Sequence, residues 1–156
     1  VLFAKEKNNY LLAFLNSKVA NYFTKMSNPT LNTIIDDILN IPVIIKDNIN
    51  VTKYILSSIK ISKNDWDSFE TSWDFLRHPL VKGNNLLNVW NEYDQLTKTN
   101  FNQLKSNEEE LNEYFINLYG LEDELTKEVE DKYVSISLAD KAVSYTHLTL
   151  PTIYSV

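Results

Sequence analysis

Apolar residues recur every three or four positions along most of the chain, and this spacing predicts a mainly α-helical protein. The clearest pattern predicts one amphipathic helix over residues 8–26, with its apolar side chains on a single face. Further helices are predicted over residues 31–41 and 51–61. Between them, residues 41–45 are β-branched and apolar around a proline, which predicts a short edge strand or an extended tie.

From residue 86 onward the helical period returns and predicts either one long helix or a two-helix hairpin. Ser106 and Glu109 fit a capping box, which favours a new helix starting there. Gly120 suits the left-handed end of that helix, with Leu121 folding back on the last turn. Residues 122–131 are acidic and predicted irregular, and residues 133–137 predict a second short strand.

Two of the three tryptophans lie within the stretch KNDWDSFETSWDFLRHPL, residues 63–80. If this stretch is helical, Trp66, Phe69, Trp73 and Leu76 share one face, which predicts a structural hub because aromatic rings bury large areas. The alternative is a base-stacking platform of the kind that nucleic-acid binders use. Four carboxylates among the rings weigh against that alternative because they repel phosphate.

Charge divides the chain into two parts. Residues 1–63 hold eight lysines and four acids, a net charge of +4, whereas residues 65–142 hold seven basic and seventeen acidic residues, a net charge of −10. This asymmetry predicts a basic helical part over residues 1–61 and an acidic helical module over residues 62–142. The basic part suits a polyanion, while the acidic part is a solvated surface.

Several features favour a cytoplasmic protein. The chain has no cysteine, no apolar run of about 18 residues and no signal-peptide pattern, which predicts no disulfide framework, no membrane partner and no secretion. The chain begins with valine, and it is therefore interpreted as part of a longer protein.

Three stretches resemble one protein family. They are ISKNDWDSFETSWDF, YLLAFLNSKVANYFTKMSNPTLN and LKSNEEELNEYFINLYGLEDELTKEVEDKYVSI, which together cover most of residues 10–142. They resemble the C-terminal region of the adenine-specific DNA methyltransferases of type 1 bacteriophage exclusion (BREX) systems, called PglX. The second stretch also resembles the end of a target-recognition region in related restriction–modification proteins. There a helix carries a Leu-Asn-Ser motif, which Asn16, Ser17 and Lys18 match.

The resemblance implies an incomplete piece of a larger multidomain bacterial enzyme. That parent would transfer a methyl group from S-adenosylmethionine to the N6 amine of adenine in a specific DNA site. Its partners would be duplex DNA and other phage-exclusion proteins. Asn16, Lys18 and Lys25 are candidate DNA-facing residues, since amides and ammonium groups contact bases and phosphates. They also suit an ordinary helix surface, which is the favoured interpretation because such contacts usually need a basic cluster.

Catalytic and cofactor motifs of such enzymes are not found in this sequence. Asn28-Pro29-Thr30 lacks the second proline and the aromatic of the Asn-Pro-Pro-Tyr pocket that holds a flipped adenine, so it is interpreted as a helix stop. Gly83 and Gly120 are the only glycines, which excludes a Gly-rich cofactor turn. The piece is therefore expected to bind no cofactor, to hold no metal and to catalyse nothing alone. The run from Glu108 to Glu110 is interpreted as a solvated helix face.

Residues 143–156 break the family pattern. Their sequence, VSYTHLTLPTIYSV, resembles the conceptual translation of a sequencing adapter, so it is excluded from fold reasoning and His147 is not considered a site residue. Two other functional classes remain alternatives. One is a non-enzymatic helical protein-interaction domain, and the other is a DNA-specificity subunit without chemistry.

Overall fold

The computed structural model describes residues 8–28, 35–46, 48–81, 85–136 and 138–139. Within these ranges the chain is mainly helical and contains no β-strand, so the predicted mainly α class is confirmed. The elements are α1 (Asn8–Leu15), α2 (Lys18–Ser27), α3 (Ile35–Leu39), α4 (Ile49–Trp66), α5 (Leu86–Tyr119) and two short 3-10 helices, η1 (Pro79–Val81) and η2 (Asp131–Tyr133).

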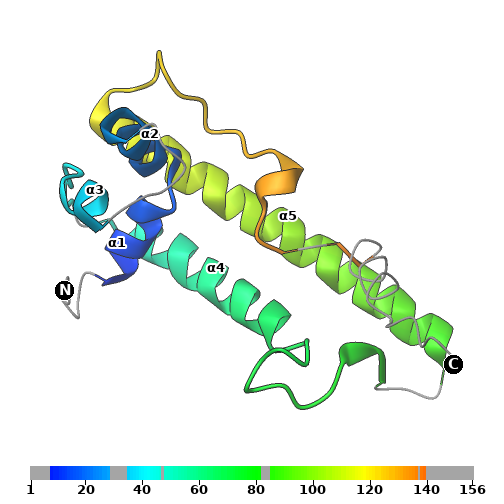
Figure 1. Cartoon of the computed structure of the whole chain (residues 1–156). Coiled ribbons are helices and arrows are strands. Elements are labelled where there is room, and N and C mark those ends of the chain that lie inside the picture. Colours follow the sequence, from blue (N-terminus) through cyan, green and yellow to red (C-terminus); the bar gives the residue numbers. More distant parts are fainter. Residues whose placement is uncertain (1–7, 29–34, 47, 82–84, 137, 140–156) are drawn as a thin grey trace, which may run out of the picture.

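The 34-residue helix α5 is the axis of the fold. α4 packs along it, and α1 and α2 gather near its C-terminal end (Figure 1). After α5 the chain turns and runs back beside the same helix, as the orange segment of Figure 1 shows. Segments from both ends of the described chain therefore pack on one long helix.

α5 is one continuous helix, so the long-helix alternative is confirmed and the hairpin is wrong. A buried seam runs without interruption along it, at spacings of three and four residues, through Tyr93, Thr97, Phe101, Leu104, Asn107, Leu111 and Phe115. The Ser106–Glu109 capping box does not start a helix here. The Glu109 carboxylate instead accepts the amide N–H of Val129, at 3.0 Å.

The two ends of α5 follow ordinary capping chemistry. The Asn85 side chain accepts the amide N–H groups of Leu87 and Asn88, at 3.0 and 3.3 Å. Gly120 ends the helix at φ 64° and ψ 43°, the left-handed region predicted for it. The amide of Leu121 then donates to the Ile116 carbonyl, and the Leu121 side chain packs against the core.

The predicted single helix over residues 8–26 is wrong, because the chain breaks at Asn16 and Ser17. Ser17 is extended (φ −78°, ψ 159°) and caps α2, since its hydroxyl oxygen accepts the Ala20 amide at 3.4 Å. The same hydroxyl donates to the Phe14 carbonyl at 2.6 Å, which ends α1. Consequently the buried face changes: Phe14 and Val19 are fully buried, whereas Leu15 is 42% exposed.

The main core surrounds Phe115 at the C-terminal half of α5. Tyr10, Phe14 and Tyr114 meet the Phe115 ring edge to face, with ring centroids 5.2–5.5 Å apart. Val51 and Ile55 of α4 complete this cluster. A second cluster, farther along α5, joins the returning chain to the helix through Phe101, Leu104, Val129, Val134 and Ile136.

Residues 41–46 form an extended tie, and the alternative of an edge strand is wrong. Tyrosine hydroxyls hold it in place: Tyr10 donates to the Ile44 carbonyl at 2.9 Å, Tyr114 to the Lys46 carbonyl at 3.2 Å and Tyr119 to the Pro42 carbonyl at 2.7 Å. The second predicted strand is also wrong. Its first residue ends η2, and the described residues after it bend.

The predicted helix through the tryptophan stretch is wrong beyond Trp66, where α4 ends and a series of turns begins. Trp66 is 56% exposed and Trp73 is 102% exposed, while Phe69 is half-buried. The predicted hub of Trp66, Phe69 and Trp73 is therefore not the core of the described chain. Ser72 and Asp74 are drawn back toward the end of α4 by polar contacts, and this turn points the Trp73 ring into solvent.

The predicted division at residues 61 and 62 falls inside α4, which runs through it unbroken. α5, from the acidic part, packs against α1, α2 and α4 from the basic part. The two parts therefore share one core, and the division remains a prediction about charge and role. The predicted tail, residues 143–156, lies outside the described residues.

Candidate functional site

A groove of about 740 Å³ runs along α2. We call it the α2 groove. One wall is α2 with the end of α1, and the opposite wall is the returning chain between Glu128 and Tyr133. Its floor comes from α5. The polar residues that line it are Asn16, Ser17, Lys18, Asn21, Thr24, Lys25, Glu108, Asn112, Glu128, Glu130 and Tyr133. All three residues that the sequence suggested as DNA-facing lie in this one groove.

The helix break at Asn16 and Ser17 forms one end of the groove. Asn16 is exposed, and its side-chain amide donates to the Leu12 carbonyl at 2.9 Å, in the last turn of α1. Because α2 restarts at a new angle, its first amide, that of Lys18, reaches the buried Asn112 oxygen at 2.9 Å. The break is therefore built into the packing of α2 on α5.

The Lys18 side chain crosses the groove and holds its two walls together. Its ammonium donates to the carbonyls of Thr126 and Glu128, at 2.9 and 2.6 Å. Asn112 adds a bond from its amide to the Lys127 carbonyl, at 3.3 Å. The structure thus shows Lys18 bound to main-chain carbonyls of the same molecule.

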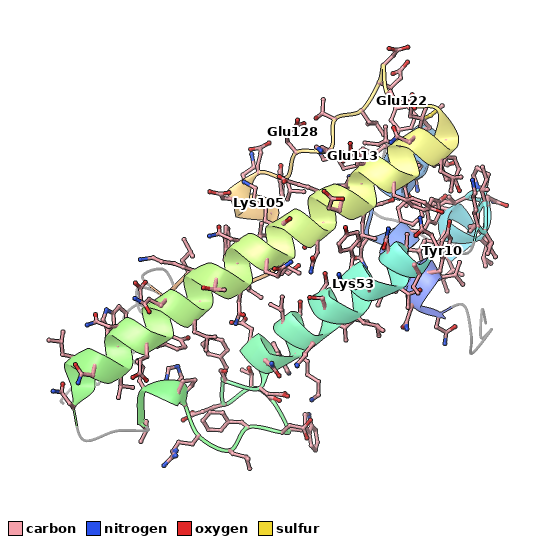
Figure 2. The ribbon with its side chains drawn as sticks, turned by 180° about the vertical axis from the view of Figure 1, so that it is seen from behind. Tyr10, Lys53, Lys105, Glu113, Glu122 and Glu128 are labelled. Carbon is pink, nitrogen blue, oxygen red and sulfur yellow. The ribbon has the colours of Figure 1, made fainter. Side chains whose placement is uncertain are left out.

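We call residues 121–130 the strap. Leu121 and Leu125 pack on the main core and Val129 on the second cluster, while Lys127 pairs with Glu113 at 2.7 Å. Figure 2 shows Glu113 and Glu128 on the side of α5 along which the strap runs. The strap is therefore fixed on α5 by apolar contacts and by polar contacts from α2.

Charges of both signs line the groove. Lys25 is exposed in the last turn of α2, and Glu108, Glu128 and Glu130 lie on the floor and the opposite wall. Glu130 is paired with Lys132 at 2.6 Å. Hydrogen bonds from its own amide and from Thr126, with Lys18 nearby, lower the pKa of Glu128, so it remains ionised. A groove of this kind is not a continuous phosphate track.

Glu108 is a groove residue that the sequence analysis missed. The run from Glu108 to Glu110 was interpreted as a solvated face, but of these three residues only Glu110 is exposed. Burial, together with the charge of Glu109, raises the pKa of Glu108 to about 7. The signal in the sequence was its position four residues before Asn112, on the turn of α5 that faces α2.

Replacing Glu108 with glutamine is expected to flatten the pH dependence of stability. Because the native carboxyl binds its proton more tightly than the unfolded one, the free energy of unfolding falls as the pH rises from about 4.5 to about 7. Glu108→Gln is expected to stabilise the chain by about 1 kcal/mol at pH 8, allowing for its partial exposure, and to change little at pH 4.5.

Urea unfolding between pH 4.5 and 8 measures this effect. Glu110→Gln is the matched control, since Glu110 is exposed on the same turn of α5. Identical pH curves for the wild-type chain and Glu108→Gln would contradict the prediction.

Within the described part of the chain, no group of three or more His, Cys, Asp or Glu side chains is arranged to hold a metal ion. No helix among the described residues combines the length and the apolarity that a membrane crossing requires.

Comparison with known proteins gives the family context of this fold. The chain is 38% identical over 138 residues to the adenine-specific methyltransferase PglX of Lacticaseibacillus casei strain Zhang. The chain resembles adenine-specific methyltransferases. It is also 34% identical over 122 residues to the adenine-specific methyltransferase BrxX of Escherichia coli O9:H4 strain HS. No protein-family model matches the chain.

The matches to PglX and BrxX cover 84% and 77% of this chain, but 12% and 10% of the two methyltransferases. The chain thus spans about a tenth of the length of the curated relatives it matches. These two matches confirm the resemblance to adenine-specific methyltransferases that was inferred from the three sequence stretches. Both names describe the full-length relatives, which are about ten times longer than the matched segment.

Proposed function

We propose that this chain is part of a site-specific DNA adenine-N6 methyltransferase of a BREX-type phage-exclusion system. The observation that carries the proposal is the 38% identity to PglX over 84% of the chain. In this proposal the chain supplies the end of the target-recognition region and a helical scaffold, and the catalytic domain lies elsewhere in the protein. The methyl donor of the full-length protein would be S-adenosylmethionine.

The charge distribution supports an orientation within that protein. The basic residues 1–61 would lie nearer to duplex DNA, and the acidic module would face other parts of the protein or phage-exclusion partners in the bacterial cytoplasm. Among the candidates in the α2 groove, Asn16 and Lys25 are exposed, whereas the Lys18 ammonium is bound to the strap. The proposal therefore gives DNA contact to Asn16 and Lys25 and a positioning role to Lys18.

The first test is to amplify and sequence the source DNA across both ends of this reading frame. The proposal expects an upstream Gly-rich cofactor turn and an Asn-Pro-Pro-Tyr motif in the same frame. It also expects that deleting the gene removes N6-methyladenine from one sequence motif of the host genome. A second recognition repeat without these motifs would instead identify a specificity subunit. An upstream frame with neither feature would leave a helical interaction domain.

Lys25→Ala in the full-length protein tests the orientation. Loss of one phosphate contact is expected to reduce the slope of log affinity against log salt by about one, with little effect on sequence preference. Lys98→Ala is the matched control, because Lys98 is exposed on α5 within the acidic module, which the proposal turns away from DNA. Equal slopes for the wild-type protein and Lys25→Ala would remove Lys25 from the DNA interface.

A further inference from the structure

The turn that follows α4 is held by polar contacts. The Lys63 ammonium bridges the carboxylates of Asp67 and Asp74, at 2.7 Å to each. The Ser72 hydroxyl donates to the Asp67 carboxylate at 2.7 Å and accepts the Asp74 amide at 3.1 Å. These four residues close the turn around Trp73, so the position of its backbone is defined on both sides.

The same segment is anchored to α5 through its inner side. The Phe69 and His78 rings are in edge contact at 6.1 Å, and the His78 ring lies 5.5 Å from that of Tyr93. η1 then packs on α5. The end of α4 and the segment after it also carry three exposed apolar side chains, Trp66, Trp73 and Leu76, which are 56%, 102% and 95% exposed. We call these three residues the Trp73 surface.

Large apolar side chains on an anchored turn mark an interaction surface. Burying a tryptophan removes a large apolar area from water, and tryptophans are enriched among the residues that dominate protein interfaces. The contacts of Lys63 with Asp67 and Asp74 hold the backbone of the turn that presents Trp73, so less backbone entropy is lost on binding. Large apolar side chains that are exposed in this way often pack against another protein surface.

The charges around the Trp73 surface specify the chemistry of its partner. Residues 63–77 contain two basic and four acidic side chains, a net charge of −2. This excess of carboxylates disfavours a nucleic acid or an anionic membrane as the partner, because the negative charges of either would repel the carboxylates. A protein surface with lysine or arginine around an apolar pocket complements it.

We propose that the Trp73 surface docks into an apolar pocket, rimmed by lysine or arginine, on another region of the full-length methyltransferase. This inference rests on the proposed function. The two curated relatives are about ten times longer than the segment they share with this chain, so the rest of such a protein is large enough to cover the surface. The docking would orient α4 and α5, and with them the α2 groove, relative to the remainder of the enzyme.

Hydroxyl-radical footprinting with mass spectrometry tests the docking. The 156-residue chain and the full-length protein are oxidised in parallel, and the rate of Trp73 oxidation is compared. We expect at least a tenfold slower rate in the full-length protein. Trp90, half-buried on α5, is the internal control and is expected to change less than twofold. Equal Trp73 rates in the two proteins would overturn the inference.

A substitution separates docking from general protection. Trp73→Ser in the full-length protein is expected to raise the oxidation of Leu76 severalfold, because the pocket loses its main ligand. Ile49→Ser is the matched control, since Ile49 is 85% exposed at the other end of α4. The inference would be overturned if the oxidation rate of Leu76 were unchanged in Trp73→Ser. It would also be overturned if the Leu76 oxidation rate rose equally in Ile49→Ser.

Two further measurements separate this inference from the proposed function. If sedimentation shows that the 156-residue chain forms a dimer that Trp73→Ser abolishes, a second copy is the occupant and the inference is overturned. If the full gene lacks methyltransferase motifs and its deletion leaves N6-methyladenine unchanged, the proposed function fails and the inference fails with it. If methylation is lost on deletion but Trp73 is oxidised equally in both proteins, only the docking inference fails.

Discussion

Phe115→Ala is expected to lower the free energy of unfolding by about 3–5 kcal/mol, the largest effect of any single substitution considered. Phe115 is 0% exposed and touches Tyr10, Phe14 and Tyr114 edge to face. Truncation removes the ring contacts and leaves a cavity that is walled by other rings and therefore collapses poorly. Since small domains are stable by about 5–15 kcal/mol, the variant is expected to be close to unfolding.

Urea unfolding followed by circular dichroism measures this loss. Leu96→Ala is the matched control, because Leu96 is 54% exposed on the same helix and its truncation is expected to change stability by no more than about 0.5 kcal/mol. Phe115→Leu keeps part of the volume and is expected to cost less than Phe115→Ala, which provides a folded variant for comparison. A cost below about 1 kcal/mol for Phe115→Ala would mean that the core is not assembled around this ring.

Asn112→Ala is expected to lower the free energy of unfolding by about 2 kcal/mol and to loosen the strap. Asn112 is 5% exposed, accepts the Lys18 amide at 2.9 Å and donates to the Lys127 carbonyl at 3.3 Å. The substitution leaves the Lys18 amide and the Lys127 carbonyl without a hydrogen bond to residue 112. Both groups are partly buried, so the loss of their hydration is no longer compensated by a hydrogen bond. Because Asn112 joins α2 and the strap to α5, the whole α2 groove is expected to open.

Hydrogen exchange provides the local readout of Asn112→Ala. The amides of Lys18 and Val129 are expected to exchange at least tenfold faster, while those in the middle of α4 follow the global change in stability. Asn102→Ala is the matched control: Asn102 is exposed on α5, so its replacement is expected to stabilise the helix by up to about 0.5 kcal/mol. If both variants behaved alike, Asn112 would have no special role in the groove.

Helix periodicity predicted α5 and α4 well because their buried faces are set by local spacing. The seam of α5 repeats every three or four residues from Tyr93 to Phe115, and no glycine or proline interrupts it. The left-handed end at Gly120 was equally predictable, since a residue without Cβ adopts a positive φ at little cost. The third helix was predicted over residues 51–61, and the structure extends it to 49–66, two residues earlier and five residues later.

Local patterns failed where a tertiary contact competed with them. The apolar spacing continues through Asn16 and Ser17, yet the helix breaks there because the Lys18 amide binds Asn112, 94 residues away. The capping box at Ser106 does not start a helix, because the buried seam of α5 continues through it and Glu109 binds the Val129 amide instead. Such long-range bonds leave no signature in the spacing of either segment.

The lining of the α2 groove was predicted in part, while the DNA contact expected of three of its residues stays a prediction. Asn16, Lys18 and Lys25 were selected from the sequence through a family resemblance, and the structure brings them into one groove. Their roles were not predictable, because the partner of the Lys18 ammonium is a carbonyl 108 residues away in the strap. Glu108 and Asn112 were missed, since one belongs to a charge run and the other to an ordinary polar position on a helix.

The sequence by itself determined the helical class, the main helices, the charge asymmetry and the resemblance to adenine-specific methyltransferases, because these follow from residue types and their spacing along the chain. The tertiary structure decided which rings are buried and which are exposed. Phe115 became the centre of the core because three helices meet at it, while Trp73 was turned outward by Lys63, Asp67 and Asp74. Both rings belong to apolar patterns in the sequence, and only the packing of distant segments distinguishes them.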